Sequence, residues 1–316
     1  MDMQVIFLGT AGSIPTTQRA LPAIAIKREG ELIIFDCGEG IQRQMIIAKV
    51  GFHKKTKVFI THMHGDHVLG LPGLIQTMSL LDRQRELEIY GPVGIKAFIK
   101  AIRQTVQFAL TFQIRVNEIT KEGTVCKEKE YAVQATFANH VVPALAYAFM
   151  EKPRPGRFNK EKAKELGVTE GPLWSKLQHG ENVKSLDGKI VKPTDVLGSS
   201  RLGRKIVYTG DTGPSKALVN LAEKADLLIH EATLGDELKE RASEDGHSTP
   251  SEAAKTAKTA KVKRLILTHI SARYRMPDSL LKQAKKIFKN AEVAEDFMRI
   301  DLPLNNSVYP KASLKV

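Results

Sequence analysis

The sequence predicts an α/β fold in which helices and strands are layered around one continuous core. Short apolar runs rich in β-branched residues recur along the 316 residues, and most of them end in turn residues or in a polar cluster. Segments with apolar positions three or four apart lie between some of these runs, as is typical of amphipathic helices. Because the two patterns interleave over the whole length, we expect α/β layering.

The strand-like runs are short and closed by turn signals, and each has the length of a buried strand. They are Gln4–Gly9, Leu32–Asp36, Val58–Thr61, Leu87–Tyr90, Tyr131–Phe137, Lys205–Tyr208, Asp226–Ile229 and Leu265–Thr268. The helical patterns expose charges on one side, and they are Gly40–Val50, Gly94–Gln107, Ser215–Lys224, Pro250–Ala260 and Ser279–Asn290. The clearest helix start is Pro250, since a proline at the first helical position lacks only an N–H that would be unpaired anyway.

Composition excludes several classes of protein. Hydrophobic residues make up 42% of the chain, which is too much for a disordered protein. The longest apolar stretch, Val141–Met150, contains a proline and is only half of the ~20 residues that a membrane-spanning helix needs, so we expect no membrane association. The N-terminus has an acid at position 2 and no basic region, which argues against a secretory signal. Cys37 and Cys126 are expected to be reduced and buried.

One segment, residues 151–204, interrupts the alternation of strands and helices. It is rich in glycine and proline and carries 12 Lys and Arg against 7 Asp and Glu. Only a short helix, near Lys160–Leu166, is expected within it. Long irregular segments in compact domains are more often functional or disordered than idle. We therefore predict a single domain, 1–316, with a flexible inserted arm at 151–204. The net charge of +13 makes a polyanionic partner plausible.

Histidines and aspartates that follow strand-like runs form the strongest signal. The string KVFITHMHGDH brings His62, His64, Asp66 and His67 directly after one run, and Asp211, His230, Glu231, His269 and His140 follow others. Loops that leave one edge of a sheet converge, so these residues can meet. In an extended turn His62 and His64 point the same way and can bind one cation, while Asp66 and His67 can face a second. Imidazole and carboxylate suit zinc, with cobalt or manganese as substitutes.

The pattern H-x-H-x-D-H with later His, Asp and His residues resembles the metallo-β-lactamase superfamily. The strings FLGTAGSIP, FDCGEG, GLPGL, PGRFN, ELGVTEGPLW, YTGDT, HEAT, HST and THISARY together resemble one branch of it, ribonuclease Z in its short form. The similarity runs from the first strand to about Tyr274. HEAT followed by HST, and the arm with its GP element at Gly171–Pro172, narrow the superfamily to this branch. The resemblance implies a four-layer αβ/βα sandwich with a protruding arm.

Carried over residue by residue, the resemblance puts His62, His64, His140 and Asp211 around one zinc ion. Asp66, His67, His269 and again Asp211 would hold the second, so that Asp211 bridges the two. Seven ligands for two ions leave coordination positions open, as a catalytic site requires. Two such ions can clamp a phosphodiester for in-line displacement.

The family further implies that Asp66 orients the attacking water. His247, paired with Glu231, would protonate the departing 3′-oxygen. Substrate contacts are expected from Gly171, Pro172, Arg19 and Arg273, and His53 and His179 are expected to be surface residues. Asp36, in FDCGEG, is expected to tie the loops of the site together by hydrogen bonds.

The resemblance thus implies a zinc phosphodiesterase of the cytoplasm that cuts precursor tRNA after the discriminator nucleotide, leaving a 3′-hydroxyl on the tRNA and a 5′-phosphate on the trailer. It also implies a homodimer in which the arm of one subunit holds the tRNA cut by the other. Two alternatives remain open: another hydrolase of the same fold, such as a lactonase, a thioester hydrolase or an mRNA endonuclease, and a basic RNA-binding protein with structural metals. Seven His and Asp ligands without cysteine argue against the second, because structural zinc sites are usually cysteine-rich.

Overall fold

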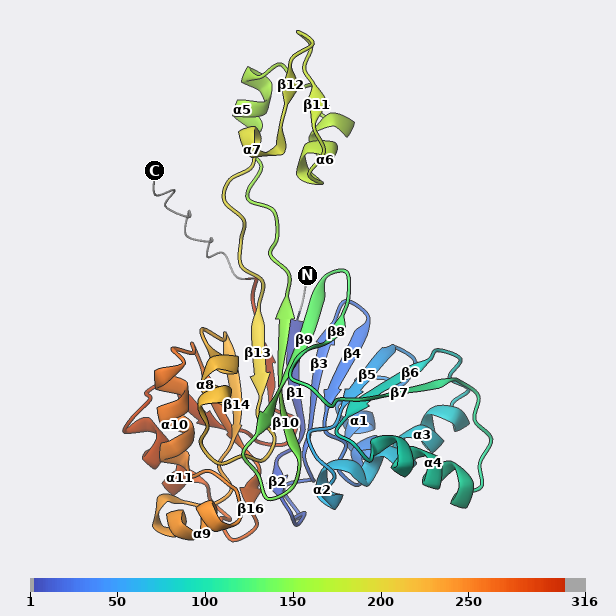
Figure 1. Cartoon of the computed structure of the whole chain (residues 1–316), viewed down its shortest axis with the longest axis vertical. Coiled ribbons are helices and arrows are strands. Elements are labelled where there is room, and N and C mark those ends of the chain that lie inside the picture. Colours follow the sequence, from blue (N-terminus) through green and yellow to red (C-terminus); the bar gives the residue numbers. More distant parts are fainter. Residues whose placement is uncertain (1–2, 305–316) are drawn as a thin grey trace. The chain divides into compact units, whose positions relative to one another are not determined.

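A computed structural model of the chain describes residues 3–304 (Figure 1). The described chain divides into two compact units. The larger unit combines residues 3–150 with residues 205–303, and the smaller one contains residues 151–204. All candidate metal ligands lie in the larger unit.

Two seven-stranded sheets form the middle of the larger unit. The first has the order β18-β1-β3-β4-β5-β6-β7 and the second the order β17-β15-β14-β13-β10-β9-β8. The strands of the first sheet are β1 (Met3–Gly9), β3 (Ala23–Arg28), β4 (Glu31–Phe35), β5 (Lys55–Phe59), β6 (Leu87–Gly91), β7 (Ile114–Glu118) and β18 (Arg299–Asp301). Those of the second are β8 (Gly123–Lys127), β9 (Tyr131–Ala138), β10 (Ala144–Glu151), β13 (Lys205–Tyr208), β14 (Leu227–Glu231), β15 (Leu265–Thr268) and β17 (Ala291–Val293).

Helices cover the outer side of each sheet, as Figure 1 shows. Helices α1 (Ile41–Ile47), α3 (Gly70–Leu80) and α4 (Ile95–Thr105) pack against the first sheet, and α8 (Lys216–Ala222), α10 (Pro250–Thr259) and α11 (Asp278–Lys285) against the second. The short helices are α2 (Gly65–Val68), α9 (Lys239–Glu244) and the 3-10 turn Asp236–Leu238. A third apolar core lies between the sheets and includes Phe35, Phe59, Tyr147 and Tyr208. The layers are therefore helix, sheet, sheet and helix, as predicted.

Parallel pairing brings the ends of the central strands together. Strand β4 pairs with β5 in parallel, and so do β13 with β14 and β14 with β15. The loops that follow parallel neighbours leave the sheet at the same edge. The sequence positions after β5, β13, β14 and β15 therefore meet at one edge of the two sheets.

The predicted elements occur, with shifted ends, and several others were not predicted. Strand β5 covers Lys55–Phe59 and ends two residues before the predicted end. Strands β3, β7, β8 and β10 and helix α3 are additional. Strand β10 is buried along most of its length, so its sequence lacks the alternation that marks a half-buried strand. Cys37 and Cys126 are buried and unpaired. Within residues 3–304, no helix has the length and apolar character of a membrane span.

The smaller unit is more ordered than its composition suggests. It contains α5 (Lys160–Glu165), α6 (Pro172–Gln178), the paired strands β11 (Val183–Lys184) and β12 (Ile190–Val191), and α7 (Pro193–Val196). These elements enclose a small core of their own, with Trp174 6% exposed and Leu177 fully buried. The indole Nε1–H of Trp174 donates to the carbonyl of Val168 at 2.9 Å. Where the segment begins and ends, the guanidinium of Arg204 pairs with Glu151 at 2.7 Å.

Candidate functional site

The candidate site is formed by loops that leave the two central sheets at one edge. His62 and His64 follow β5, and His64 is the N-cap residue of α2, which carries Asp66 and His67. His140 follows β9, Asp211 follows β13 and His269 follows β15. Gly210 has a φ of 58°, and a side chain there would collide with Thr61 at 2.7 Å. Glycine at this position therefore lets the loop with Asp211 approach the loop with His62.

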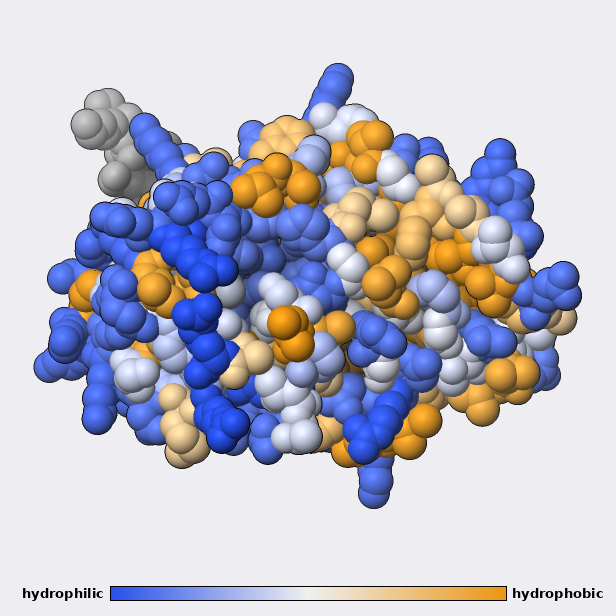
Figure 2. All heavy atoms as spheres, turned by 90° about the horizontal axis from the view of Figure 1, so that it is seen from below, coloured by the Kyte–Doolittle hydropathy of each residue, from blue (hydrophilic) through white to orange (hydrophobic). Residues whose placement is uncertain are grey.

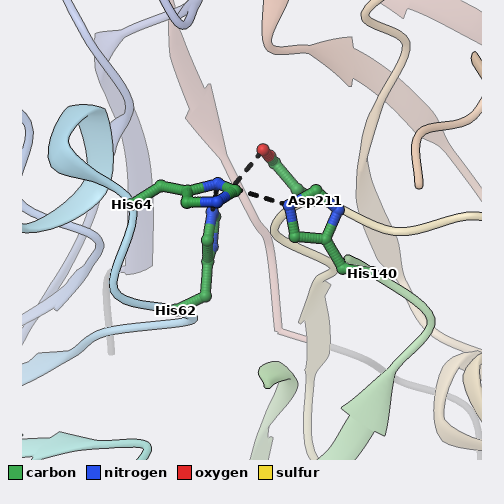
Figure 3. A group of neighbouring side chains, drawn as sticks. All are labelled: His62, His64, His140 and Asp211. Atoms are coloured by element: carbon green, nitrogen blue, oxygen red, sulfur yellow. Dashed lines mark hydrogen bonds and ion pairs between the residues drawn. The ribbon is translucent and has the colours of Figure 1, made fainter. Parts of the chain in front are cut away.

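Three histidines and a carboxylate form the first group of possible ligands (Figure 3). His62 Nε2 lies 3.0 Å from His64 Nδ1, and His140 Nε2 lies 3.3 Å from the same atom. His62 Nε2 is 3.7 Å from Asp211 Oδ2. Figure 3 shows the four side chains pointing toward one another. His62 and Asp211 are buried, and His64 and His140 are partly exposed.

Asp66, His67 and His269 form the second group, and Asp211 of the first group adjoins it. Nε2 of His67 and Nε2 of His269 lie 3.3 Å apart. Both nitrogens are close to Asp66 Oδ2, at 3.4 and 3.3 Å, and to Asp211 Oδ1, at 3.4 and 3.3 Å. The seven predicted ligands therefore come together as two adjoining groups with Asp211 between them.

Hydrogen bonds at the second ring nitrogen determine which nitrogen faces the groups. Nδ1–H of His67 donates to Asp36 Oδ2 at 2.7 Å, and Nδ1–H of His140 donates to the carbonyl of Gly246 at 2.8 Å. A carboxylate and a carbonyl can only accept, so Nδ1 carries the hydrogen in both rings. Nε2 of each ring therefore faces the groups, and it presents a lone pair there when it is deprotonated, as metal-binding histidines do.

Two threonines orient the rings of His62 and His269 in the same way. Thr61 Oγ1 donates to Asp36, so it accepts from Nδ1–H of His62 at 3.0 Å. Thr233 Oγ1 donates to Glu231 Oε2 at 2.7 Å and accepts from Nδ1–H of His269 at 2.8 Å. The sequence reasoning missed both threonines. The sequence gives only a weak local signal for each role. Thr61 directly precedes the ligand His62, and Thr233 is the last residue of the string HEAT.

The donor arrangement fits divalent cations. Once His67 loses its Nε2 proton, the lone pairs of Nε2 of His67 and Nε2 of His269 face each other at 3.3 Å and repel unless a cation lies between them. Asp211 Oδ1 is buried and makes no hydrogen bond, which is costly without a compensating charge. Imidazole and carboxylate donors without thiolate are suitable for zinc, cobalt or manganese.

Burial and neighbouring charges prepare the ligands for a cation. Burial lowers the pKa of His62 to about 2, so this ring stays neutral. Burial alone would raise the pKa of Asp211, but the charges of His269 and His67 hold it well below its usual range. Burial opposes charge on His67 as well, yet Asp211 and Asp36 raise its pKa well above the ordinary value. A metal ion must therefore displace a proton from His67 in order to bind.

Buried Glu231 and partly exposed His247 form a pair beside the second group. Nδ1–H of His247 donates to Glu231 Oε1 at 2.8 Å, and Thr212 N–H donates to the same oxygen at 3.0 Å. Burial would lower the pKa of His247, but the Glu231 carboxylate raises it to about 9. His247 also lies 4.0 Å from Asp211 Oδ2, so the pair adjoins the shared carboxylate.

The four predicted substrate contacts lie in different surroundings. Arg19 is turned inward and donates to Thr10 Oγ1 and to the carbonyl of Ala294, both at 2.6 Å. Arg273 is exposed in the turn that follows β16 (Ile270–Ser271). Gly171 and Pro172 are exposed at the N-terminus of α6, in the smaller unit. His53 and His179 are exposed, as expected.

Asp36 has the tying role that the sequence suggested. It is fully buried with a φ of 59°, and its oxygens accept from Thr61 N–H at 2.7 Å and from the Tyr208 hydroxyl at 2.8 Å, besides His67. One carboxylate thus connects the loop after β4, the loop after β5 and strand β13.

Comparisons with known proteins agree with this arrangement. A family model described as Beta-lactamase superfamily domain matches residues 175–270, and one described as Anti-Pycsar protein Apyc1 matches residues 3–148. A metallo-β-lactamase fold protein from Bacillus subtilis superposes with a TM-score of 0.68 at 19% identity, over 95% of this chain and all of that one. The superposition confirms the predicted fold class.

Two relatives are more similar in sequence. The Ribonuclease Z of Methanosarcina acetivorans is 48% identical over 302 residues, which cover 95% of this chain and 98% of that protein. The crystal structure of human tRNase Z, short form, superposes with a TM-score of 0.71 at 32% identity, over 95% of this chain and 100% of that chain. Both similarities span the two units of the chain.

Proposed function

The chain belongs to the ribonuclease Z family, and from this premise we propose that the two groups of ligands are the centre at which it cleaves RNA. It is a hydrolase, an endonuclease of tRNA 3′-end processing. The cut is proposed to fall after the discriminator nucleotide and to leave a 3′-hydroxyl on the tRNA and a 5′-phosphate on the trailer. The observation that supports this reading best is the Glu231–His247 pair beside a double ligand group, because it supplies a proton donor where two cations would hold a phosphodiester.

The proposed metals are two zinc ions per chain, with manganese or cobalt as substitutes. His62, His64 and His140 would hold one ion, Asp66, His67 and His269 the other, and Asp211 both. When bound, two such ions polarise the scissile phosphate and provide the nucleophile at neutral pH. The Nε2 atoms of His67 and His269 that face each other, and the buried Asp211 oxygen that makes no hydrogen bond, support this division.

The remaining chemistry is assigned to three side chains. Asp66, whose Oδ2 accepts from the backbone N–H of Ser13 at 2.9 Å, would orient the attacking water. His247 would give a proton to the departing 3′-oxygen from Nε2, since its Nδ1–H is already donated to Glu231. Glu231 would keep His247 charged and hold its ring, and its own hydrogen bonds to Thr212 and Thr233 fix its position.

One experiment tests the reaction directly. The purified protein, loaded with zinc, is incubated with a 3′-extended precursor tRNA and both new ends are mapped. We expect a single cut after the discriminator nucleotide that is abolished by a chelator and restored by zinc. Hydrolysis of a lactone or a thioester without any cut in the RNA would favour another hydrolase of this fold. Metal-dependent RNA binding without hydrolysis would favour the binding protein.

Residues 151–204 are proposed to hold the body of the tRNA, with Gly171 and Pro172 among the contacts. The segment carries a net charge of +5 and encloses its own core, so it can present a basic surface without support from the sheets. Replacing residues 155–200 by a short Gly-Ser linker retains the paired positions Arg154 and Arg201. We expect weaker binding of precursor tRNA and unchanged hydrolysis of bis(p-nitrophenyl) phosphate. Normal tRNA cleavage by this variant would contradict the assignment.

We further propose a homodimer. Large apolar side chains are exposed on α1 and α3, which pack against each other: Ile46 is 62% exposed and Leu80 is 78% exposed. Figure 2 views the molecule from below, and it shows hydrophobic residues gathered on the half of that face where α1 to α4 lie. A second copy could bury this surface. Sedimentation should give a dimer for the wild type and a monomer for Ile46→Lys/Leu80→Lys, and a wild-type monomer would refute the proposal.

The compartment proposed for this chain is the cytoplasm. Two buried and unpaired cysteines are compatible with a reducing environment. Precursor tRNA as the substrate supports the same compartment. Fluorescence of a tagged full-length chain in cells tests it.

A further inference from the structure

The positive charge of the chain is concentrated in two stretches. Residues 255–289 contain eleven Lys and Arg residues and a single acid, Asp278, which gives a net charge of +10. Residues 151–204 carry +5, so the rest of the chain, which includes most of both sheets, has a net charge of −2. A chain that bore lysines only for solubility would spread them over its surface. The stretch at residues 255–289 lies outside the arm, so binding by the arm does not account for its charge.

Exposed basic residues of this stretch follow His269 along the chain. They begin at Arg273, in the turn after β16 and four residues beyond His269, and continue over α11 to Lys289, which follows the helix. We define the basic face as six exposed residues, Arg273, Arg275, Lys282, Lys285, Lys286 and Lys289. Lys285 and the C-cap residue Lys286 come three and four residues after Lys282, so these three share one side of α11, while Leu280 and Ala284 face the core. Lys289 lies in the bend after the helix.

Hydrogen bonds fix the basic face to the loop that follows Glu231. The backbone N–H of Asp236 donates to Gln283 Oε1 of α11 at 2.9 Å, and Gln283 Nε2 donates to Glu237 at 3.1 Å. The Tyr274 hydroxyl donates to Glu237 at 2.7 Å and accepts from Gly235 N–H at 2.8 Å. The basic face is therefore held in a set position relative to the catalytic pair.

None of the six basic side chains makes an ion pair with an acid in the described part of the chain. Lys263, which belongs to the same stretch, does pair, with Asp226 at 2.7 Å. Like charges on neighbouring helical turns repel one another. A row of unneutralised cations that begins beside a phosphodiesterase site is therefore suited to a polyanion.

We propose that the basic face binds the phosphate backbone of the base-paired RNA stem adjacent to the cleaved bond. This inference rests on the proposed function, since it extends the RNA site beyond the metal ligands. A single-stranded partner is less well suited, because such sites use exposed aromatic rings to stack bases. Both aromatic residues of this stretch, Tyr274 and Phe288, are packed against the outer core. Lysines without aromatic rings match phosphate contacts to a duplex, which are independent of sequence.

The test compares two full-length, zinc-loaded variants with equal changes in charge. In the face variant, Lys282, Lys285, Lys286 and Lys289 are replaced by glutamine. In the control variant, the exposed Lys96, Lys100, Lys121 and Lys129 are replaced by glutamine. Binding is measured over a range of salt for three RNAs: mature tRNA, which has no trailer to remove, an acceptor-stem hairpin, and a single-stranded trailer oligonucleotide. Metal content and melting temperature check that both variants are folded.

We expect the face variant to bind mature tRNA and the hairpin on the order of 10- to 100-fold more weakly than the control variant. Its salt dependence should be shallower by roughly 2–4 in slope, about one for each lost phosphate contact. Equal affinities and slopes for the two variants would overturn the proposal. A loss confined to the trailer oligonucleotide would overturn the assignment to a stem. Cleavage mapping with the wild type decides the proposed function separately, since these binding results do not depend on turnover.

Discussion

Replacing Asp36 by asparagine should weaken metal binding although Asp36 is not a predicted ligand. The two side chains have nearly the same shape, but one carboxylate oxygen becomes an NH2 donor. If the remaining oxygen keeps the backbone N–H of Thr61, the NH2 group faces Nδ1 of His67, which now has no acceptor. The imidazole would then move its hydrogen to Nε2, the nitrogen that faces Asp66 and Asp211. A protonated Nε2 cannot bind a metal ion.

The magnitude follows from the contacts. Loss of a hydrogen-bond partner that orients a ligand typically costs 10- to 100-fold in metal affinity, or about 1.4–2.7 kcal/mol. The folded protein should also lose on the order of 1.5–3 kcal/mol, the usual contribution of a hydrogen bond to a charged group. Stability and metal affinity should therefore both decrease.

A matched variant separates the two effects. Tyr208→Phe removes a donor to the same Asp36 oxygen but leaves His67 untouched. It should reduce the melting temperature while the zinc affinity, measured by titration against a competing chelator, stays near the wild-type value. Only Asp36→Asn should lose both. Wild-type zinc affinity in Asp36→Asn, or an equal loss of affinity in Tyr208→Phe, would refute the tautomer argument.

Three further results are expected. Asp211→Ala should lose turnover and part of its zinc, because one carboxylate serves both groups of ligands; two zinc ions per chain with normal turnover would contradict the shared role. His247→Ala should keep its zinc and cleave precursor tRNA ~100- to 10,000-fold more slowly, with a smaller loss on a substrate whose leaving group needs no proton; loss of zinc would instead make His247 a ligand. Zinc affinity should fall as the pH is lowered. Below its raised pKa the His67 ring keeps a proton, and zinc must displace that proton in order to bind. Chelator titrations that give the same zinc affinity at pH 6, 7 and 8 would contradict this expectation.

The sequence predicts the layers and the location of the candidate ligands better than it predicts the supporting contacts. Strands β13 and β15 were predicted with their observed ends, because each is a short apolar run closed by a polar cluster. Helix α3 was missed because Gly70, Pro72 and Gly73 look like breakers, although a proline in the first helical turn costs little. Thr233 could not be found from sequence, since its role depends on three-dimensional proximity to His269 and Glu231.

Residues 151–204 leave the second sheet between two neighbouring strands that pair with each other. Strands β10 and β13 are antiparallel neighbours, with Met150 opposite Lys205 and Tyr147 opposite Tyr208. A tight hairpin between residues 150 and 205 would preserve the same ladder, so the segment is an enlarged hairpin loop. Lengthening such a loop costs little free energy, about 0.6 kcal/mol for each doubling. Evolution can therefore exchange, shorten or enlarge this module without moving Asp211, which follows β13, and RNA selectivity can change while the chemistry is inherited intact.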